Sequence, residues 1–367
     1  MSMTYAGTGV RYDAMDPFKR RAQEAARQTA CNVSRLGFQV RMESYGESAF
    51  LVEPTDAISY TQAHVEEGLG TKNLVADAMY ALTGKSYYDH IAQCAVAMIV
   101  NDLVTLGALP LSVAMHLAVG TSAWFEDEKR SSDLVRGWKN ACDLARCAWG
   151  GGETPTLKGI IMPEAVALSG SATGVIKPRE QLITGSIQAG DAIVIIESSG
   201  IHANGLTLAR TIADSLPQGY LTTLSDGRSY GEALLDPTHL YVGLVEDCLN
   251  AGIDIHYAVN VTGHGWRKLM RSTQSWSYII ETLPKQLPIF DFLQQHGPVD
   301  DIEAYGNLNM GAGFALYVRE VYAPAVLAVA RSLGLGALVA GHIEAGNKKV
   351  VIRPKGLEYV GDTLAVR

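Results

Sequence analysis

The sequence predicts a protein of two α+β domains, and three observations lead to this prediction. The chain has 367 residues, which is enough for two domains with substantial cores. Apolar residues make up 47% of it and charged residues 19%, a balance typical of folded globular proteins. Helix-like and strand-like segments occur in both halves without the regular alternation of a parallel sheet. We expect domains at residues 1–180 and 181–367.

The first half of the chain shows clear helix and strand patterns. Between residues 89 and 106, apolar side chains recur at helical spacing, which favours a helix. Between residues 111 and 119, apolar and other side chains alternate, as in a strand with one buried face. Three glycines at residues 150–152 favour the end of a helix. The predicted strands are residues 49–53, 111–119 and 164–176, and the predicted helices are residues 89–106 and 126–148.

The second half has the same mixed character. A short apolar run at residues 192–196 predicts a strand, and it ends at Ser198-Ser199-Gly200. Pro324 suits the first turn of a helix that begins at Ala323. The predicted strands are residues 192–196, 313–318 and 337–342, and the predicted helices are residues 206–214, 241–251 and 323–333.

Charge and hydropathy argue against several classes of protein. A formal net charge of −8 is unlike that of a nonspecific nucleic-acid-binding protein, which needs a basic face. A phosphorylated small molecule stays compatible with this charge, because backbone amides at a helix N-terminus can hold it. No apolar stretch approaches the roughly 18 to 20 residues of a membrane helix. The polar start of the chain lacks the features of a secretory signal, so we expect a cytoplasmic protein.

The cysteines favour reduced thiols. Five cysteines are an odd number, and none forms a C-x-x-C pair, which argues against a disulfide framework or a zinc site. Cys142 and Cys147 are expected on one helix, where a separation of five residues puts them on different faces. We interpret both as small core residues.

The first candidate binding motif is the loop Glu67-Gly68-Leu69-Gly70-Thr71-Lys72. Its glycines let the backbone approach phosphate oxygens, Thr71 and Lys72 add donors, and the carboxylate of Glu67 can serve a magnesium ion. The loop lacks the four-residue gap between glycines of a Walker A motif. A plain glycine turn before a helix is the alternative interpretation.

Two further carboxylates stand out. Asp102 follows Asn101 inside an otherwise apolar helix, where an ionised carboxylate is costly unless it is paired, exposed or metal-bound. The alternative is that Asp102 lies on the solvent side of an amphipathic helix. Glu153 follows the three glycines and precedes Thr154, so a flexible loop carries one metal-capable carboxylate. The alternative there is a helix C-cap followed by a turn.

Two loops of the second half are suited to binding an anion. The loop at residues 198–205 lies between a strand and a helix, where backbone N–H groups and the helix dipole favour negative charge. His202 and Asn204 would there orient a substrate or donate protons, although a loop histidine is more often simply a hydrogen-bonding residue. Thr262-Gly263-His264-Gly265 precedes a helix expected from Trp266, with a glycine turn as the alternative.

In this order, the motifs resemble those of the aminoimidazole ribonucleotide synthetase (phosphoribosylformylglycinamidine cyclo-ligase) family. The resemblance runs from Tyr5 to about His342, and its most specific part is the Ser-Ser-Gly-x-His-x-Asn-Gly loop at residues 198–205. The other matching segments are Tyr5-Ala6-Gly7 with Val10, Gly68-Leu69-Gly70-Thr71-Lys72, Asn101-Asp102-Leu103, Gly151-Gly152-Glu153-Thr154, Leu235-Asp236-Pro237-Thr238 and Asn309-Met310-Gly311. The chain departs from the family at Glu67 and Ala167, where Asp is usual, at His264, where Gly is usual, and at residues 156–159.

The resemblance implies a fold and an activity. It implies an N-terminal ATP-binding domain with dimer-forming strands and a C-terminal αβ domain. The implied enzyme is an ATP- and Mg²⁺-dependent ligase of purine biosynthesis that works as a cytoplasmic homodimer. It closes the ring of formylglycinamidine ribonucleotide through a phosphorylated amide, giving aminoimidazole ribonucleotide. The alternatives are a related ligase or kinase of the same superfamily, or a nucleotide-binding paralogue without catalysis.

The resemblance also supports a hypothesis for the site residues. Lys72 would contact the transferring phosphate, and His202 and Asn204 would act with it in catalysis on the substrate. The metal ligands would be Asp102, Glu153 and Glu67. Residues expected to bind nucleotide or substrate are Gly68, Gly70, Thr71, Lys72, Asn101, Gly152, Thr154, Ser199, Thr262 and Gly263.

Overall fold

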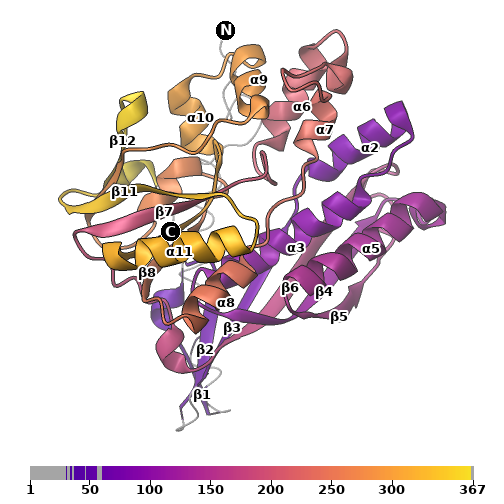
Figure 1. The fold of residues 1–367 in the computed structure, drawn as a ribbon. Helices are drawn as coiled ribbons and strands as arrows, with labels where there is room; N and C mark the ends of the chain where they lie inside the picture. The colour runs from indigo at the N-terminus through magenta and orange to yellow at the C-terminus, as the bar shows by residue number, and fades with distance from the viewer. Residues whose placement is uncertain (1–29, 31–33, 35–36, 46, 56–59, 365–367) are drawn as a thin grey trace.

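The structure is a computed structural model that describes residues 30, 34, 37–45, 47–55 and 60–364. The predicted motif of Tyr5, Ala6, Gly7 and Val10 lies outside these residues. Helices and strands are mixed in both halves, and the strands form two separate sheets, which confirms the α+β fold (Figure 1). The domain boundary at residue 180 stays a prediction. Along the described residues, no helix combines the length and the apolar character that crossing a membrane requires.

The first sheet has six strands in the order β1-β2-β3-β6-β4-β5. Neighbouring strands are antiparallel except β4 and β5, which are parallel, and β5 forms one edge of the sheet. The strands are β1 (Phe38–Val40), β2 (Phe50–Pro54), β3 (Thr61–Gly68), β4 (Leu109–Val119), β5 (Ala148–Glu153) and β6 (Val166–Ile176).

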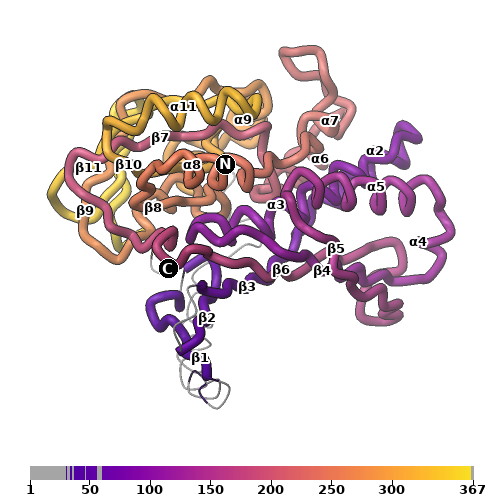
Figure 2. The backbone as a smooth tube through the Cα atoms, turned by 60° about the horizontal axis from the view of Figure 1, so that its bottom comes forward, coloured from indigo at the N-terminus to yellow at the C-terminus, as the bar shows by residue number. Residues whose placement is uncertain are grey.

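Helices cover one face of this sheet. Helix α3 (Tyr88–Val104) contacts β3, β4 and β6, and α5 (Glu128–Leu144) packs beside it (Figures 1 and 2). The approach of α3 and α5 is close, because a Cβ atom on Gly137 would lie 2.4 Å from the Cα atom of Asp89. The opposite face of the sheet carries exposed side chains such as Gln62, His64 and Thr173. The other helices of this domain are α2 (Lys72–Thr83), α4 (Ala123–Glu126) and α5 (Glu128–Leu144).

The second sheet has seven strands in the order β13-β12-β9-β11-β7-β10-β8. Its strands are β7 (Asp191–Glu197), β8 (Ile255–Asn260), β9 (Trp276–Ile280), β10 (Ala312–Arg319), β11 (Ala337–Ala345), β12 (Lys349–Ile352) and β13 (Leu357–Val360). Its helices are α6 (Leu206–Ser215), α7 (Tyr230–Leu234), α8 (Val242–Asn250), α9 (Pro288–His296), α10 (Asp301–Asn307) and α11 (Ala323–Ser332). Helix α11 has proline in its first turn, as the sequence predicts.

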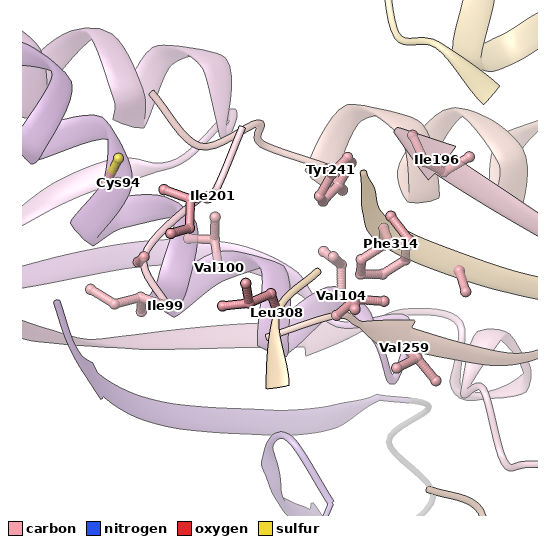
Figure 3. Close-up of a cluster of buried hydrophobic side chains, with 14 of the residues drawn as sticks. Cys94, Ile99, Val100, Val104, Ile196, Ile201, Tyr241, Val259, Leu308 and Phe314 are labelled. Atoms are coloured by element: carbon pink, nitrogen blue, oxygen red, sulfur yellow. The ribbon is translucent and has the colours of Figure 1, made fainter. Parts of the chain in front are cut away.

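The two domains share one apolar core. Val100 and Val104 of α3 belong to the same buried cluster as Ile201, Leu308 and Phe314 of the second domain (Figure 3). Burial of such side chains contributes roughly 25 cal/mol for each Å² of apolar surface removed from water. The core therefore holds α3 against the loops of the second domain, where the predicted site residues lie.

The helix predicted over residues 126–148 is wrong at both ends. Asp127 caps the N-terminus of α5 by accepting from the backbone N–H of Arg130, and α5 ends at Leu144. Arg146, with a φ of 54°, supplies the left-handed residue that ends the helix. The three glycines are therefore not a helix cap, because they already lie in β5. The helix expected from Trp266 is a 3-10 segment, η6 (Gly265–Met270).

Candidate active site

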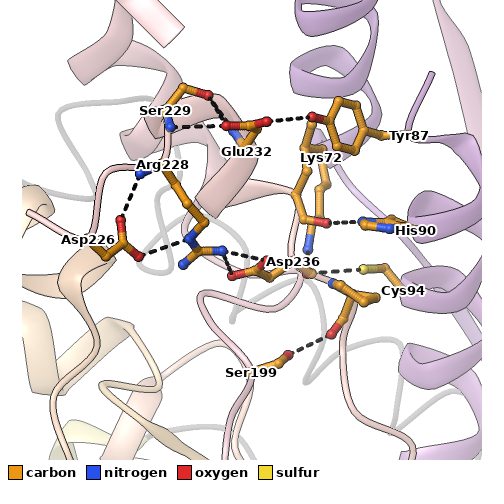
Figure 4. A network of polar contacts seen from close by, with 12 residues as sticks. Lys72, Tyr87, His90, Cys94, Ser199, Asp226, Arg228, Ser229, Glu232 and Asp236 are labelled. Carbon is orange, nitrogen blue, oxygen red and sulfur yellow. Dashed lines mark hydrogen bonds and ion pairs between the residues drawn. The ribbon is translucent and has the colours of Figure 1, made fainter. Parts of the chain in front are cut away.

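An extended segment of the second domain, residues 235–241, is held against α2 and α3 through its backbone. Side chains of the first domain bond several of its carbonyl oxygens, so the segment follows α3. Figure 4 shows the part of this contact near Lys72, His90 and Asp236. The contacts are His90 Nδ1 with the carbonyl oxygen of Leu235 at 2.9 Å, Lys72 Nζ with that of Asp236 at 2.7 Å, Gln93 Nε2 with that of Thr238 at 2.9 Å, and Asn101 Nδ2 with that of His239 at 2.8 Å.

Asn101 uses both ends of its side-chain amide in this contact. Its Nδ2 donates to the carbonyl oxygen of His239, and its Oδ1 accepts from the backbone N–H of Tyr241 at 2.9 Å. Asn101 is buried, so these bonds are shielded from water. The structure thus places Asn101 at a domain contact, and its role in binding nucleotide or substrate stays a prediction.

Lys72 is also in a different setting from the predicted one. Its side chain is fully buried, and its ammonium group donates to the carbonyl oxygens of His202 at 2.8 Å and Asp236 at 2.7 Å. An ammonium group has three hydrogens, so at most one is left for a phosphate. In this arrangement Lys72 supports the loop that contains His202.

The loop at residues 198–205 joins β7 to α6, as predicted, and His202 lies in it with a φ of 60°. The backbone N–H of Ser199 donates to His202 Nε2 at 3.2 Å, so the neutral ring carries its proton on Nδ1. Burial lowers the pKa of His202 well below its usual value, and the charges of His239 and Lys72 add to this effect. His202 is therefore a neutral donor at pH 7.

Asn309 fixes the same loop from the other side. Its Oδ1 accepts from the hydroxyl of Ser198 at 3.0 Å, and its Nδ2 donates to the carbonyl oxygen of Gly200 at 2.9 Å. Ser199, a predicted substrate contact, instead donates its hydroxyl to the carbonyl oxygen of Pro237 at 2.6 Å. The side-chain nitrogen of Asn204 is buried and has no hydrogen-bond partner among the described residues. A buried donor of this kind is suited to bind an oxygen atom of a ligand.

Two of the predicted metal ligands lie close together. Burial, with the neighbouring charge of Asp102, raises the pKa of Glu67 to about 7, while Lys268 and Arg271 act in the opposite direction. Asp102 is buried and accepts from Asn260 Nδ2 at 2.6 Å, so it is not on the solvent side of α3. The ammonium group of Lys268 contacts the hydroxyl of Thr262 in the predicted anion loop. Two carboxylates of the first domain and a lysine of the second domain thus meet at one place.

Glu153 lies apart from this cluster. It is exposed in β5, opposite His116 of β4, and two strands separate β5 from the β3 strand that carries Glu67. Three strand spacings amount to about 14 Å. Among the described residues, no group of three or more His, Cys, Asp or Glu side chains is arranged to hold a metal ion. Glu67 and Asp102 alone fit a Mg²⁺ ion, which commonly binds one or two carboxylates together with substrate phosphates.

The glycine-rich loop precedes α2, as the sequence predicts. Gly70 has a φ of 75°, and the side chain of Thr71, the N-cap residue, makes no capping hydrogen bond. The first amides of α2 are thus not capped by that side chain and are suited to an anion. Gly152 and Thr154 lie with Glu153 at the exposed end of β5, and Gly263 lies in the loop between β8 and η6.

Sequence reasoning missed several residues of this site. Lys268 and Asn260 were not predicted, because each acts through a partner far away in the chain. Asn309 was matched only as part of a family segment, and its contact with Ser198 was not predicted. His239 was missed although it follows the Leu235–Thr238 motif. Its ring centroid lies 6.3 Å from that of His202, and burial lowers its pKa.

The domains match known family models. Residues 63–176 match the model described as AIR synthase related protein, N-terminal domain, and residues 188–353 match the model of the corresponding C-terminal domain. Two such domains define the class of AIR synthase related proteins, and the chain belongs to this family.

Curated relatives specify the family further. A phosphoribosylformylglycinamidine cyclo-ligase from Carboxydothermus hydrogenoformans is 33% identical and aligns over 95% of this chain and 98% of its own length. One from Symbiobacterium thermophilum is also 33% identical, over 96% of this chain and 98% of its own length. The chain is thus a relative of these cyclo-ligases over nearly its whole length.

Solved structures show the same fold. Thiamine-monophosphate kinase from Stenotrophomonas maltophilia K279a has a TM-score of 0.59 at 20% identity, over 91% of this chain and 97% of that one. The hydrogenase maturation protein HypE in complex with ATP has a TM-score of 0.60 at 19% identity, over 81% of this chain and 83% of that one. At these identities the likeness concerns the fold alone.

Proposed function

We propose that this protein is an ATP-dependent ligase that closes the imidazole ring of aminoimidazole ribonucleotide from formylglycinamidine ribonucleotide, in the cytoplasm. The observation that carries the proposal is the full-length match to curated cyclo-ligases. The meeting of Glu67, Asp102, Lys268 and the His202 loop between the two domains supports it, because this reaction must bring two phosphorylated molecules, ATP and the substrate, together.

The reaction sets the tasks of these residues. An amide oxygen is a poor leaving group, so ATP phosphorylates it, and the neighbouring amidine nitrogen then displaces phosphate as the ring closes. Catalysis of phosphoryl transfer depends mainly on positioning and on charge stabilisation. Mg²⁺, when bound, would neutralise the phosphates, and Glu67 and Asp102 would hold it. Lys268 would take the role of phosphate contact that the sequence assigned to Lys72, since Lys72 is occupied by two carbonyl groups.

The His202 loop would bind the second substrate. Neutral His202 donates from Nδ1, and the side-chain nitrogen of Asn204 donates to an oxygen of the substrate. Gly68, Gly70 and Thr71 would hold a phosphate together with the first amides of α2. The exposed face of the first sheet, which includes His64 and Thr173, would form a homodimer with a second copy of this chain. Sedimentation velocity tests the dimer, and a monomer at micromolar concentration would contradict it.

The decisive experiment is ADP release by the purified protein with Mg-ATP, with and without formylglycinamidine ribonucleotide. ADP that depends on the substrate, with matching aminoimidazole product, is the expected result. Glu67→Gln should raise the Mg²⁺ concentration needed for half-maximal rate, whereas the exposed neighbouring variant Glu66→Gln should not. ATP binding without substrate-dependent ADP would instead indicate a nucleotide-binding paralogue, or a related ligase or kinase with another substrate.

A further inference from the structure

Cys142 and Cys147 lie at the C-terminus of α5 in a motif that brings them together. The backbone N–H of Cys147 donates to the carbonyl oxygen of Cys142 at 3.0 Å, and that of Arg146 donates to the carbonyl oxygen of Asp143 at 3.0 Å. With Arg146 in the left-handed conformation, these two bonds define a Schellman motif. In this motif the chain turns back on itself, and the side chains at the two positions occupied here by Cys142 and Cys147 characteristically contact each other. The expectation that Cys142 and Cys147 lie on different faces of one helix is therefore wrong, because α5 ends at Leu144.

The two thiols are paired but unequal. Cys142 is buried, Cys147 is partly exposed, and both are reduced. The interaction between the two thiols, together with burial, raises the pKa of Cys142. The same interaction lowers the pKa of Cys147. Cys147 is thus the thiol that ionises first and that solvent reaches. A partly exposed thiolate beside a second thiol is the usual setting of a redox-sensitive pair.

Arg146, between the two cysteines, joins the first domain to the second. Its guanidinium group bonds Glu246 Oε2 at 2.6 Å and Asp247 Oδ1 at 2.7 Å, both on α8. It also lies against the backbone of α8, because a Cβ atom on Gly243 would be 3.2 Å from its Nη2. The turn closed by the two cysteines therefore presents the arginine that contacts the other domain.

We propose that Cys142 and Cys147 form a reversible disulfide, and that this modification is coupled to the contact of Arg146 with α8. Hydrogen peroxide would oxidise the Cys147 thiolate to a sulfenic acid, with hydroxide as the leaving group. The Cys142 sulfur then attacks the Cys147 sulfur, the S–O bond breaks, and water leaves. In total, two thiols and one peroxide give one disulfide and two waters. A dithiol reductant reverses the reaction by thiol–disulfide exchange.

Peroxide treatment of the folded protein, followed by alkylation and peptide mass spectrometry, tests the site. The expected product is a peptide pair joined by a bond between Cys142 and Cys147, two hydrogens lighter than the reduced form, while Cys94 and Cys248 stay alkylatable after denaturation. In Cys142→Ser, Cys147 should stop at the sulfenic acid, trapped by dimedone. If wild-type Cys147 accumulates dimedone adduct while Cys142 keeps a free thiol, the proposed disulfide is excluded.

The coupling to α8 needs a separate measurement. Asp247→Asn weakens the contact of Arg146 without touching either sulfur, so it should change the equilibrium constant for disulfide exchange with glutathione by about fivefold or more. Asp254→Asn, an exposed change elsewhere in the second domain, serves as the control. Equal constants for all three proteins would show that the disulfide and the domain contact are independent. Neither result depends on the proposed ligase activity.

Discussion

The ammonium group of Lys72 lies 2.8 Å from the carbonyl oxygen of His202, although the two residues are 130 positions apart in the chain. Lys72 begins α2, directly after the glycine-rich loop, and His202 lies in the loop expected to hold the substrate. This hydrogen bond links the predicted phosphate loop to the predicted substrate loop. The left-handed backbone of His202 costs roughly 1 to 2 kcal/mol, so its carbonyl needs such support to stay in place.

Lys72→Met should lower the free energy of unfolding by about 2 to 4 kcal/mol, because two buried carbonyl groups lose their charged donor. Urea unfolding at neutral pH measures this. Lys139→Met is the matched control, since Lys139 is exposed and its ion pair with Asp143 contributes at most about 0.5 kcal/mol. Unchanged stability combined with lost ADP release would return Lys72 to the phosphate contact predicted from the sequence.

Asn101→Asp tests the contact between α3 and residues 235–241. The substitution keeps the size of the side chain but turns the donor toward the His239 carbonyl into an acceptor. We expect a loss of about 2 to 4 kcal/mol in unfolding free energy, because two acceptors then face each other in a buried place. Asn250→Asp, at an exposed position at the end of α8, should change stability little. Equal effects of the two variants would contradict the role given to Asn101.

Gly137→Ala tests the packing of α5 on α3. In an exposed helix this change stabilises by about 1 kcal/mol. Here the added Cβ atom would lie 2.4 Å from the Cα atom of Asp89, so the helices must separate, and we expect a loss of about 1 to 3 kcal/mol. Thermal unfolding compared with the exposed Ser132→Ala variant measures it. A higher melting temperature for Gly137→Ala would show that α3 and α5 are further apart than described.

Much of the fold follows from local patterns in the sequence. The apolar residues of α3 and the alternation in β4 each have a period that only one kind of element satisfies. The end of α5 could not be predicted in this way. Arginine has little preference for the left-handed conformation, and what favours it at Arg146 is the ion pairs with α8, a hundred residues away.

The candidate site could also be predicted only in part, because several of its contacts join residues that are far apart in the chain. The loops at Glu67 and His202 could be predicted from the sequence, because glycine and polar residues interrupt apolar segments there. Whether Lys72 faces a phosphate or a carbonyl depends on residues 202 and 236, which no local pattern places beside it. The separation of Glu153 from Glu67 likewise follows from strand order, which the spacing of the two residues does not contain.

The buried neutral state of His202 predicts how stability depends on pH. In the unfolded chain a histidine titrates near 6.5, and in the folded protein burial keeps the pKa of His202 well below that value. Between these two values the unfolded chain binds more protons. The stabilisation is therefore complete above about pH 6.5 and is lost as the pH falls, by at most about 1.4 kcal/mol per pH unit for one proton.

His202→Gln isolates this contribution, because its side-chain oxygen accepts from the N–H of Ser199 but does not titrate. Urea unfolding between pH 5 and 7.5 should show a weaker dependence on pH than in the wild type, with the remainder due partly to His239, whose pKa is also lowered. His342→Gln, at an exposed histidine, is the control. Nitrogen NMR of the wild type at pH 6 should show His202 neutral with its proton on Nδ1. A doubly protonated ring at that pH would mean that the loop is open to water, and the neutral donor role of His202 would then be wrong.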